Sequence, residues 1–174
     1  MTQIDMLLSY GIKLYMVFDG APLPLKAGTE AHRAASRREC LEKGLAFLQK
    51  NDYNNARTYL SRAVDVTPLM AAELIRCIKR ERPGVQCVVA PYEADAQMAF
   101  LSHSGLVDAV ISEDSDCIPF GCTDVIFKLD AKTGICQRIT LDDVYLTFIK
   151  GFDLRSFTKE VRVHYIYITL FFWT

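Results

Sequence analysis

The chain has 174 residues, of which 51% are hydrophobic and 24% are charged. This length and composition are typical of one globular domain and exclude a disordered chain. The net charge of −1 excludes a global electrostatic attraction to nucleic acid or to a membrane, so any such attraction has to be local. The six cysteines form no CxxC pair and no secretory signal is visible, so we expect reduced intracellular thiols and no structural zinc site.

The first half of the chain predicts a short helix, one strand and then three further helices. A short helix stopped by Gly11 leads into a strand over residues 13–18, whose apolar end is typical of a strand covered on both faces. Two prolines then mark a loop. Helical patterns follow over residues 29–50, 56–64 and 69–82.

The hydrophobic period then changes to that of strands. Strands are predicted over residues 85–90, 106–111 and 125–129, and a helix over residues 93–104 joins the first two. A crossover of this length predicts parallel pairing in a right-handed βαβ unit. Residues 130–134 (DAKTG) are typical of a hairpin turn. The expected fold class is therefore α/β, a parallel sheet with flanking helices and a helical insertion.

Three of the predicted strands end in acidic residues. KLYMVFDG, CVVAPYEAD and DAVISEDSD supply Asp19, Glu93, Asp95, Asp114 and Asp116. Because the carboxyl ends of parallel strands lie along one edge of a sheet, we expect these five acids to converge. Each acid by itself is more simply explained as a turn residue or a helix N-cap, and Glu93 and Asp95 stand at a helix start that favours negative charge.

Convergence of these acids would require a cation. Carboxylates that lie close together destabilise a fold unless positive charge neutralises them. Oxygen ligands without histidine or cysteine partners suit Mg²⁺ or Mn²⁺. Two such ions about 4 Å apart activate a water and stabilise the leaving oxygen of a phosphodiester. The three acidic strand ends therefore predict two-metal phosphodiester hydrolysis.

A local excess of positive charge follows the strand that ends in Asp19. Residues 26–43 contain five cations against three acids: the cations are Lys26, Arg33, Arg37, Arg38 and Lys43. Arg33 and Arg37 share a helix face, and a guanidinium fork there suits a phosphate. A solvated helix with internal Glu–Arg pairs explains the same segment equally well. Only its position beside the acidic edge favours phosphate binding.

Two further stretches indicate other functions. Residues 42–68 resemble one tetratricopeptide unit, which leaves a helical interaction module as a hypothesis, although a stable stack needs about three copies and no second copy is visible. Residues 161–174 (VRVHYIYITLFFWT) are β-branched and aromatic, and too short to span a bilayer as a helix. We interpret them as sequence foreign to the domain, with a strand or a membrane-touching tail as alternatives.

Four motifs together resemble the nuclease domain of the XPG-type structure-specific nucleases. They are VFDG, the P-x-K step at Pro24–Lys26, VAPYEADAQMAFL and ISEDSDCIPFGC. The resemblance runs from about residue 6 to about residue 128, and the two acidic motifs are its most specific part. Members of the family also carry a first strand ending in another metal-binding aspartate and a C-terminal helix–two-turn–helix, so the resemblance implies a fragment of the family's domain.

The resemblance also implies a domain organisation. Residues 1–150 would form a partial PIN/XPG-like nuclease core. Within it, a helical arch would cover about residues 26–67 and the acidic motifs about residues 85–130. A divergent apolar tail would occupy residues 151–174.

The resemblance implies a Mg²⁺-dependent 5′–3′ exodeoxyribonuclease or 5′ flap endonuclease in DNA mismatch repair and recombination, located in the nucleus. The five acids would hold two Mg²⁺ ions, with Mn²⁺ as a substitute. Lys26 and Arg33 would be catalytic residues at the scissile phosphate, and together with Arg37 and Arg38 would bind DNA.

The implied partners are DNA with a 5′ end, nick, gap or flap, and mismatch-repair proteins. No membrane and no organic cofactor are expected. The alternative hypothesis is a truncated, catalytically inactive product of the same family that binds DNA or protein.

Overall fold

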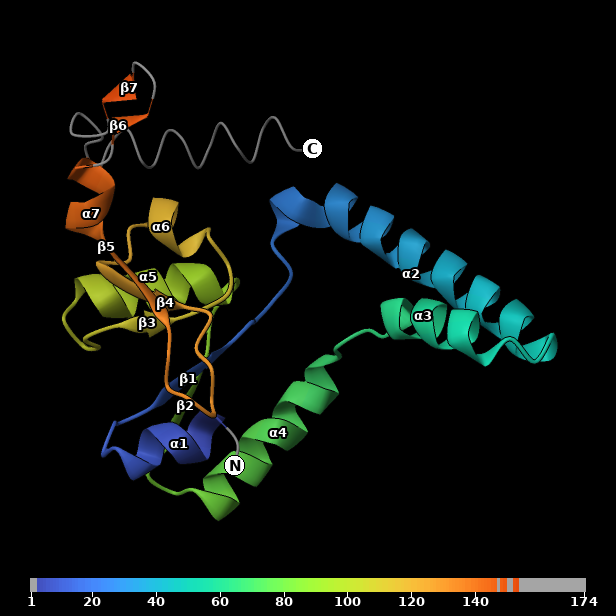
Figure 1. Ribbon diagram of the computed structural model, residues 1–174, viewed down its shortest axis with the longest axis horizontal. Helices are drawn as coiled ribbons and strands as arrows, with labels where there is room; N and C mark the ends of the chain where they lie inside the picture. Colours follow the sequence, from blue (N-terminus) through green and yellow to red (C-terminus); the bar gives the residue numbers. More distant parts are fainter. Residues whose placement is uncertain (1–2, 147, 150–151, 154–174) are drawn as a thin grey trace. The chain divides into compact units, whose positions relative to one another are not determined.

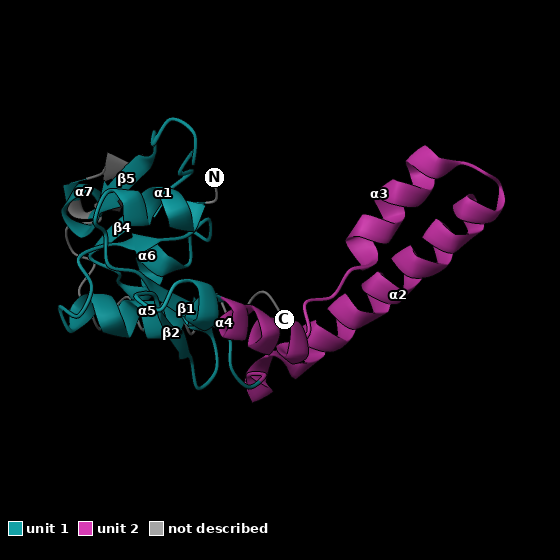
Figure 2. Ribbon diagram, turned by 90° about the horizontal axis from the view of Figure 1, so that it is seen from below, with its two compact units in different colours: residues 1–21, 78–173 teal, residues 22–77, 174 magenta. Residues whose placement is uncertain are grey.

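The computed structural model describes residues 3–146, 148–149 and 152–153. The described residues form two compact units (Figure 2). The helical unit comprises residues 22–77, and the sheet unit combines residues 3–21 with the described residues from Ile78 onward. The helical unit is therefore inserted in sequence between two parts of the sheet unit. The predicted divergent tail, apart from Phe152–Asp153, lies outside the described residues.

The sheet unit contains two separate sheets with parallel pairs, in place of the one continuous sheet that the sequence predicts (Figure 1). In the first, β1 (Tyr15–Phe18) pairs in parallel with β2 (Gln86–Val89). In the second, β3 (Val110–Ile111) pairs in parallel with β4 (Asp124–Phe127), which pairs antiparallel with β5 (Gln137–Thr140). The predicted pairing of the two strands around the crossover helix is wrong, because β2 and β3 each bond to a different neighbour.

The sheet unit contains a cavity of about 1150 Å³, which is lined by residues from both separate sheets. Its lining includes consecutive residues of both parallel pairs, from Leu14 to Val17 and from Leu106 to Ile111. Among the described residues, β1 bonds only to β2 and β3 only to β4. The two pairs stay separate because no described strand bridges them.

Short helices surround the sheets of this unit: α1 (Gln3–Ser9), α5 (Ala94–His103), α6 (Cys117–Phe120) and α7 (Leu141–Leu146). The core lies where α5 and α6 meet β3 and β4, and it consists of Ala99, Val110, Cys117, Cys122, Val125 and Phe127. Cys117 is completely buried at the start of α6. A fourth pair of strands, β6 (Phe148–Ile149) and β7 (Phe152–Asp153), follows α7.

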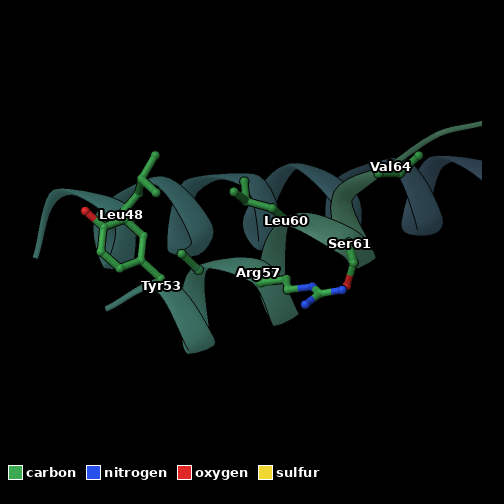
Figure 3. Close-up of a pocket in the computed structure, with 7 residues that line it drawn as sticks. Leu48, Tyr53, Arg57, Leu60, Ser61 and Val64 are labelled. Atoms are coloured by element: carbon green, nitrogen blue, oxygen red, sulfur yellow. The ribbon is translucent and has the colours of Figure 1, made fainter. Parts of the chain in front are cut away.

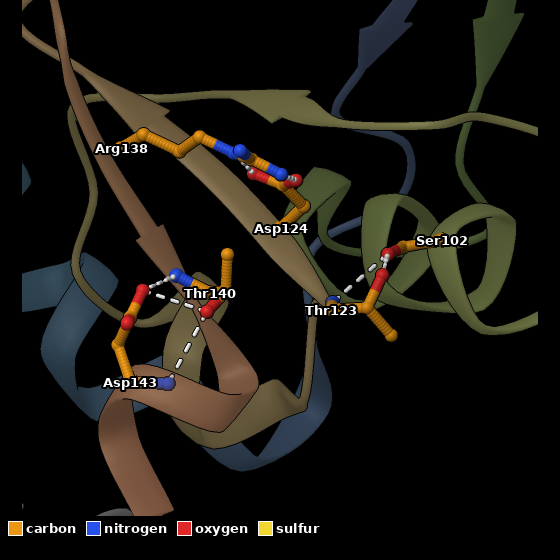
Figure 4. Close-up of polar contacts among 6 residues, drawn as sticks. All are labelled: Ser102, Thr123, Asp124, Arg138, Thr140 and Asp143. Carbon is orange, nitrogen blue, oxygen red and sulfur yellow. Dashed lines mark hydrogen bonds and ion pairs between the residues drawn. The ribbon is translucent and has the colours of Figure 1, made fainter. Parts of the chain in front are cut away.

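Polar contacts hold β4 and β5 in register and join β4 to α5 (Figure 4). Arg138 Nε donates to Asp124 Oδ1 at 3.0 Å across the two strands. Ser102 Oγ and Thr123 Oγ1 lie 2.8 Å apart, and Ser102 is buried. The predicted hairpin turn is confirmed, since Asp130 Oδ1 accepts the Lys132 N–H at 2.8 Å inside the turn between β4 and β5.

The helical unit begins with a 3₁₀ turn, η1 (Pro24–Lys26), followed by α2 (Ala27–Gln49), α3 (Tyr53–Ala63) and the start of α4 (Pro68–Glu81). These positions confirm the three predicted helices. Asp52 starts α3 as its N-cap, because its Oδ1 accepts the Asn55 N–H at 3.2 Å. No described helix combines the length and the apolar character needed to cross a bilayer.

A glycine allows α2 and α3 to pack closely. Gly44 is buried, and a Cβ at this position would lie 2.8 Å from side-chain atoms of Leu60. Nearby, the rings of Phe47 and Tyr59 stack with their centroids 5.4 Å apart. These contacts give α2 and α3 an apolar interface. The spacing of apolar residues along the two helices does not by itself identify it.

The same helix pair carries an open apolar groove of about 530 Å³ (Figure 3). Its lining comes from one residue of α2, one face of α3 and the residue that follows α3: Leu48, Tyr53, Ala56, Arg57, Leu60, Ser61 and Val64. Tyr53 and Val64 are 66% and 64% exposed. The described chain contains a single such helix pair, so the repeat-like stretch is a helical hairpin without a stacked second copy.

Replacement of Gly20 by alanine should destabilise the sheet unit. The Gly20 N–H donates to the Tyr92 carbonyl at 2.6 Å, and a Cβ at Gly20 would lie 1.8 Å from the Ala90 carbonyl oxygen. Backbone atoms cannot move aside cheaply, so Gly20→Ala should lower the free energy of unfolding by roughly 1–3 kcal/mol or more in urea titrations.

Gly84→Ala is the matched control, because a Cβ at Gly84 would meet no atom within 4 Å. This change should alter the free energy of unfolding by at most about 0.5 kcal/mol. Equal effects of the two changes would contradict the close approach of Gly20 to the segment after β2.

Candidate metal and nucleic-acid site

Asp19 reaches from the end of β1 to the first turn of α5. The Ala94 N–H donates to Asp19 Oδ1 at 2.8 Å, although the two residues are 75 positions apart in sequence. The free N–H groups and the dipole at a helix start both favour a carboxylate there. Glu93 occupies the N-cap position of α5, but its side chain makes no capping bond. The carboxylate that caps α5 is therefore the distant Asp19.

Asp95 lies in the first turn of α5, close to three other carboxylates. The Cys117 thiol donates to Asp95 Oδ1 at 3.6 Å. Burial, the charge of Asp114, and then the charges of Asp116 and Asp19 raise the pKa of Asp95. The structure thus brings four of the five predicted acids into one electrostatic environment. We call Asp19, Asp95, Asp114 and Asp116 the acidic cluster.

The loop from β3 to α6 orients the two acids that it contributes to the cluster. The Asp114 N–H donates to Ser112 Oγ at 3.0 Å. The Asp116 N–H in turn donates to Asp114 Oδ1 at 2.9 Å. Helix α6 starts at the next residue, the buried Cys117. These bonds give the loop a defined conformation immediately before a residue that is fixed in the core.

The donor atoms of the acidic cluster fit a hard divalent cation. All are carboxylate oxygens, the ligands that Mg²⁺ and Mn²⁺ prefer. Burial and, after it, the charges of the neighbouring carboxylates raise the pKa of Asp95, and a bound cation would relieve the repulsion. Within the described part of the chain, no three Asp, Glu, His or Cys side chains are already arranged to hold a metal ion. The assignment of the five acids as metal ligands therefore stays a prediction.

The four predicted DNA-binding cations belong to the helical unit. Lys26 precedes α2 directly, and the other three lie on it: Arg33, Arg37 and Arg38. Arg33 Nη1 pairs with Glu30 Oε1 at 2.9 Å. Arg37 Nη2 pairs with Asp65 Oδ2 at 3.3 Å. The internal Glu–Arg pairing that offered the simpler explanation of this helix is thus present for Arg33.

The ion pair of Arg33 with Glu30 is open to exchange with a phosphate. The side chains of Arg33 and Glu30 are 63% and 44% exposed. Exposed ion pairs of this kind contribute about 0–1 kcal/mol, so a phosphate can replace the acid at little cost. None of the ion pairs among the described residues involves the exposed Arg38.

Sequence reasoning missed two residues that support the cluster. The Ser112 hydroxyl accepts the Asp114 N–H, and a serine that can accept the backbone N–H two residues further on is a turn signal that could have identified it. Cys117 contacts Asp95, but the two residues are 22 positions apart. No local pattern indicates such a contact, because only the packing of α5 against α6 creates it.

Removal of the Asp95 charge should stabilise the metal-free protein at neutral pH. The raised pKa of Asp95 means that the folded state holds this proton more tightly than the unfolded state. The ionised carboxylate therefore reduces stability as the pH rises above the ordinary value of 3.8. We expect Asp95→Asn to raise the free energy of unfolding at pH 7 by at most about 1 kcal/mol, because the group is partly in water.

Chemical denaturation between pH 3 and pH 8 checks this expectation. The gain should disappear towards pH 3, where Asp95 is protonated in both states. Asp108→Asn, at an exposed acid of the same unit, should give no gain at either pH. A less stable Asp95→Asn protein at pH 7 would contradict the expectation that the ionised Asp95 side chain, through burial and repulsion, destabilises the fold.

Two family models match the sequence. The XPG N-terminal domain matches residues 1–40 and the XPG I-region matches residues 84–165, which together cover more than half of the chain. Exonuclease 1 of Oryza sativa subsp. japonica is 45% identical over 161 residues, 92% of this chain and 19% of that protein. Exonuclease 1 of Danio rerio is 49% identical over 127 residues, 73% of this chain and 16% of that protein. The chain thus spans about a fifth of the length of these curated relatives.

Solved structures agree with this relationship. The catalytic core of Rad2 in complex with DNA substrate matches with a TM-score of 0.54 and 27% identity, over 82% of this chain and 38% of that chain. Flap endonuclease-1 from Methanococcus jannaschii matches in fold with a TM-score of 0.53 and 23% identity, over 94% of this chain and 60% of that chain. The α/β class predicted from the sequence is confirmed. The chain belongs to the XPG family of nucleases.

Proposed function

We propose that the chain hydrolyses DNA phosphodiester bonds near a 5′ end, as a 5′–3′ exodeoxyribonuclease or 5′ flap endonuclease. The observation that carries this proposal is the acidic cluster, in which three separate segments bring carboxylates together, so that their charges add to the effect of burial in raising the pKa of Asp95. The similarity to exonuclease 1 proteins and to the Rad2 core in complex with DNA supports the choice of substrate.

In this proposal, the acidic cluster and Glu93 hold two Mg²⁺ ions, with Mn²⁺ as a substitute. Bound ions of this kind supply an activated water and neutralise charge on the leaving oxygen. Asp19 and Asp114 each accept a backbone N–H through Oδ1. These bonds fix the orientation of both carboxylates before a cation arrives, which reduces the ordering needed on binding.

The cations of the helical unit have a separate task in the proposal. Lys26 and Arg33 contact the scissile phosphate and stabilise the charge that develops on it. Arg37 and Arg38 bind the DNA backbone without reading its sequence.

On the family resemblance alone, we extend the proposal to DNA mismatch repair and recombination, to mismatch-repair proteins as partners and to the nucleus as the location.

DNA binding without cleavage is the second candidate function. The observation that favours it is that the described residues contain no ready-made group of three metal-binding side chains. The two candidates differ in one respect, since only the first predicts that added Mg²⁺ leads to turnover.

Substitution of the loop acids should abolish cleavage. With 5′-labelled duplex or flap DNA and Mg²⁺, we expect Asp116→Asn to lower kcat/KM at least about a hundredfold, because one ligand and one neutralising charge are removed. Chelation of Mg²⁺ should have the same effect. Asp142→Asn, at an exposed acid of the same unit, is the control and should leave the rate unchanged.

Activity that survives Asp114→Ala and Asp116→Ala together would exclude the assigned site. DNA binding by the unaltered chain with no turnover at any Mg²⁺ concentration would support the second candidate instead.

Loss of the α2 arginines should weaken DNA binding in a salt-dependent way. We expect Arg33→Ala with Arg37→Ala to lower affinity and to reduce the slope of log Kd against log salt by roughly 0.7–0.9 for each phosphate that the protein no longer neutralises. Fluorescence anisotropy over a series of KCl concentrations measures both quantities.

Arg76→Ala is a matched control in the same unit. Arg76 forms an exposed pair with Glu73 three residues earlier, as Arg33 does with Glu30. An equal loss of affinity in Arg76→Ala would show that the effect comes from net charge and not from the α2 surface.

A further inference from the structure

Glu113 belongs to the acidic run EDSD, but its carboxylate binds a different part of the chain from the carboxylates of Asp114 and Asp116. The Lys128 N–H, 15 residues further on, donates to Glu113 Oε1 at 2.9 Å. The charges that raise the pKa of the nearby Asp95 come from Asp114, Asp116 and Asp19. The three acids of this motif therefore have two different roles. Glu113 binds a backbone N–H, whereas Asp114 and Asp116 belong to the acidic cluster.

The bond to Lys128 continues the pairing of β3 with β4 beyond the end of β3. The ladder covers Val110 and Ile111 and extends by one bond, in which the Ser112 N–H donates to the Ile126 carbonyl at 3.2 Å. A regular parallel ladder would next place a backbone carbonyl opposite the Lys128 N–H. Here the acceptor is Glu113 Oε1. The side chain therefore takes the place of backbone pairing where the chain turns into the loop.

This bond is significant because β3 is very short. A strand of two residues offers few backbone bonds, whereas the acids that follow it must be held in place. The bonds of Asp114 to Ser112 and of Asp116 to Asp114 are internal to the loop, so they shape the loop without attaching it to the sheet. At the other end, Cys117 is buried in the core.

We infer that Glu113 is a positioning residue, which anchors the β3–α6 loop to β4 and thereby sets the positions of Asp114 and Asp116. A carboxylate that accepts a backbone N–H forms a stronger bond than a neutral acceptor does. The anchor itself requires only the fold, whereas its consequence for metal binding rests on the proposed function.

Two substitutions distinguish the role of Glu113 as a hydrogen-bond acceptor from the effect of its negative charge. Glu113→Gln keeps an oxygen that can accept the Lys128 N–H, and Glu113→Ala removes it. In the metal-free protein, amide hydrogen exchange should become roughly fivefold to tenfold faster at Lys128 in Glu113→Ala, as expected for loss of one hydrogen bond. Exchange at Lys128 should stay close to that of the unaltered chain in Glu113→Gln.

Binding of Mn²⁺ provides the second measurement and does not depend on cleavage. By electron paramagnetic resonance, Glu113→Ala should weaken Mn²⁺ binding about 10–100-fold, the range found when a residue supporting a metal ligand is removed, and Glu113→Gln should restore it. Asp130→Ala is the matched control, since Asp130 Oδ1 accepts the Lys132 N–H at 2.8 Å in the adjacent hairpin turn. It should accelerate exchange at Lys132 and leave Mn²⁺ affinity unchanged.

The outcomes distinguish the anchor from the proposed function. Unchanged exchange at Lys128 in Glu113→Ala would overturn the anchor. Equal loss of Mn²⁺ affinity in Glu113→Gln and Glu113→Ala would also overturn it, because the charge of Glu113 would then act on the metal directly. Absence of Mn²⁺ binding by the unaltered chain would overturn the proposed metal site, while exchange at Lys128 would still decide the anchor.

Discussion

Mutual repulsion among carboxylates that the fold holds close together is the constraint on which the site depends. The four members of the acidic cluster come from β1, from α5 and from the loop after β3. Burial and, after it, this repulsion raise the pKa of Asp95, and both oppose folding with the carboxylate ionised. The fold compensates partly with hydrogen bonds to the carboxylates, such as that from the Ala94 N–H to Asp19. A divalent cation would neutralise the remainder, and this need links the stability of the site to the proposed chemistry.

Three carboxylates at or beside the site therefore have distinct roles. Asp19 caps a helix that begins far away in sequence. Asp114 organises its own loop by accepting the Asp116 N–H. Glu113 connects that loop to β4 through Lys128. Acids that look equivalent along the sequence thus differ in what they bind, because each faces a different backbone group.

Several elements could be predicted from sequence because their causes are local. The turn after β4 forms where Asp130 can bind the Lys132 N–H within three residues. Helix α3 was predicted to begin at residue 56 and begins earlier, at Tyr53, because Asp52 caps it. The division of the strands into two sheets could not be predicted. The strands β2 and β3 have similar local sequence patterns, but each pairs with a different strand. The contact of Cys117 with Asp95 likewise depends on helix packing.

The sequence by itself determined the family, the order of strands β1 to β4 and of helices α1 to α5, and the acids at the strand ends, because residue type and spacing control hydrogen bonding over a few positions. Only the tertiary structure decided which strands pair, which acids share one environment and which of them bind backbone groups instead. These outcomes depend on contacts between segments such as β1 and α5, and a sequence pattern does not contain the distances between segments that are remote along the chain.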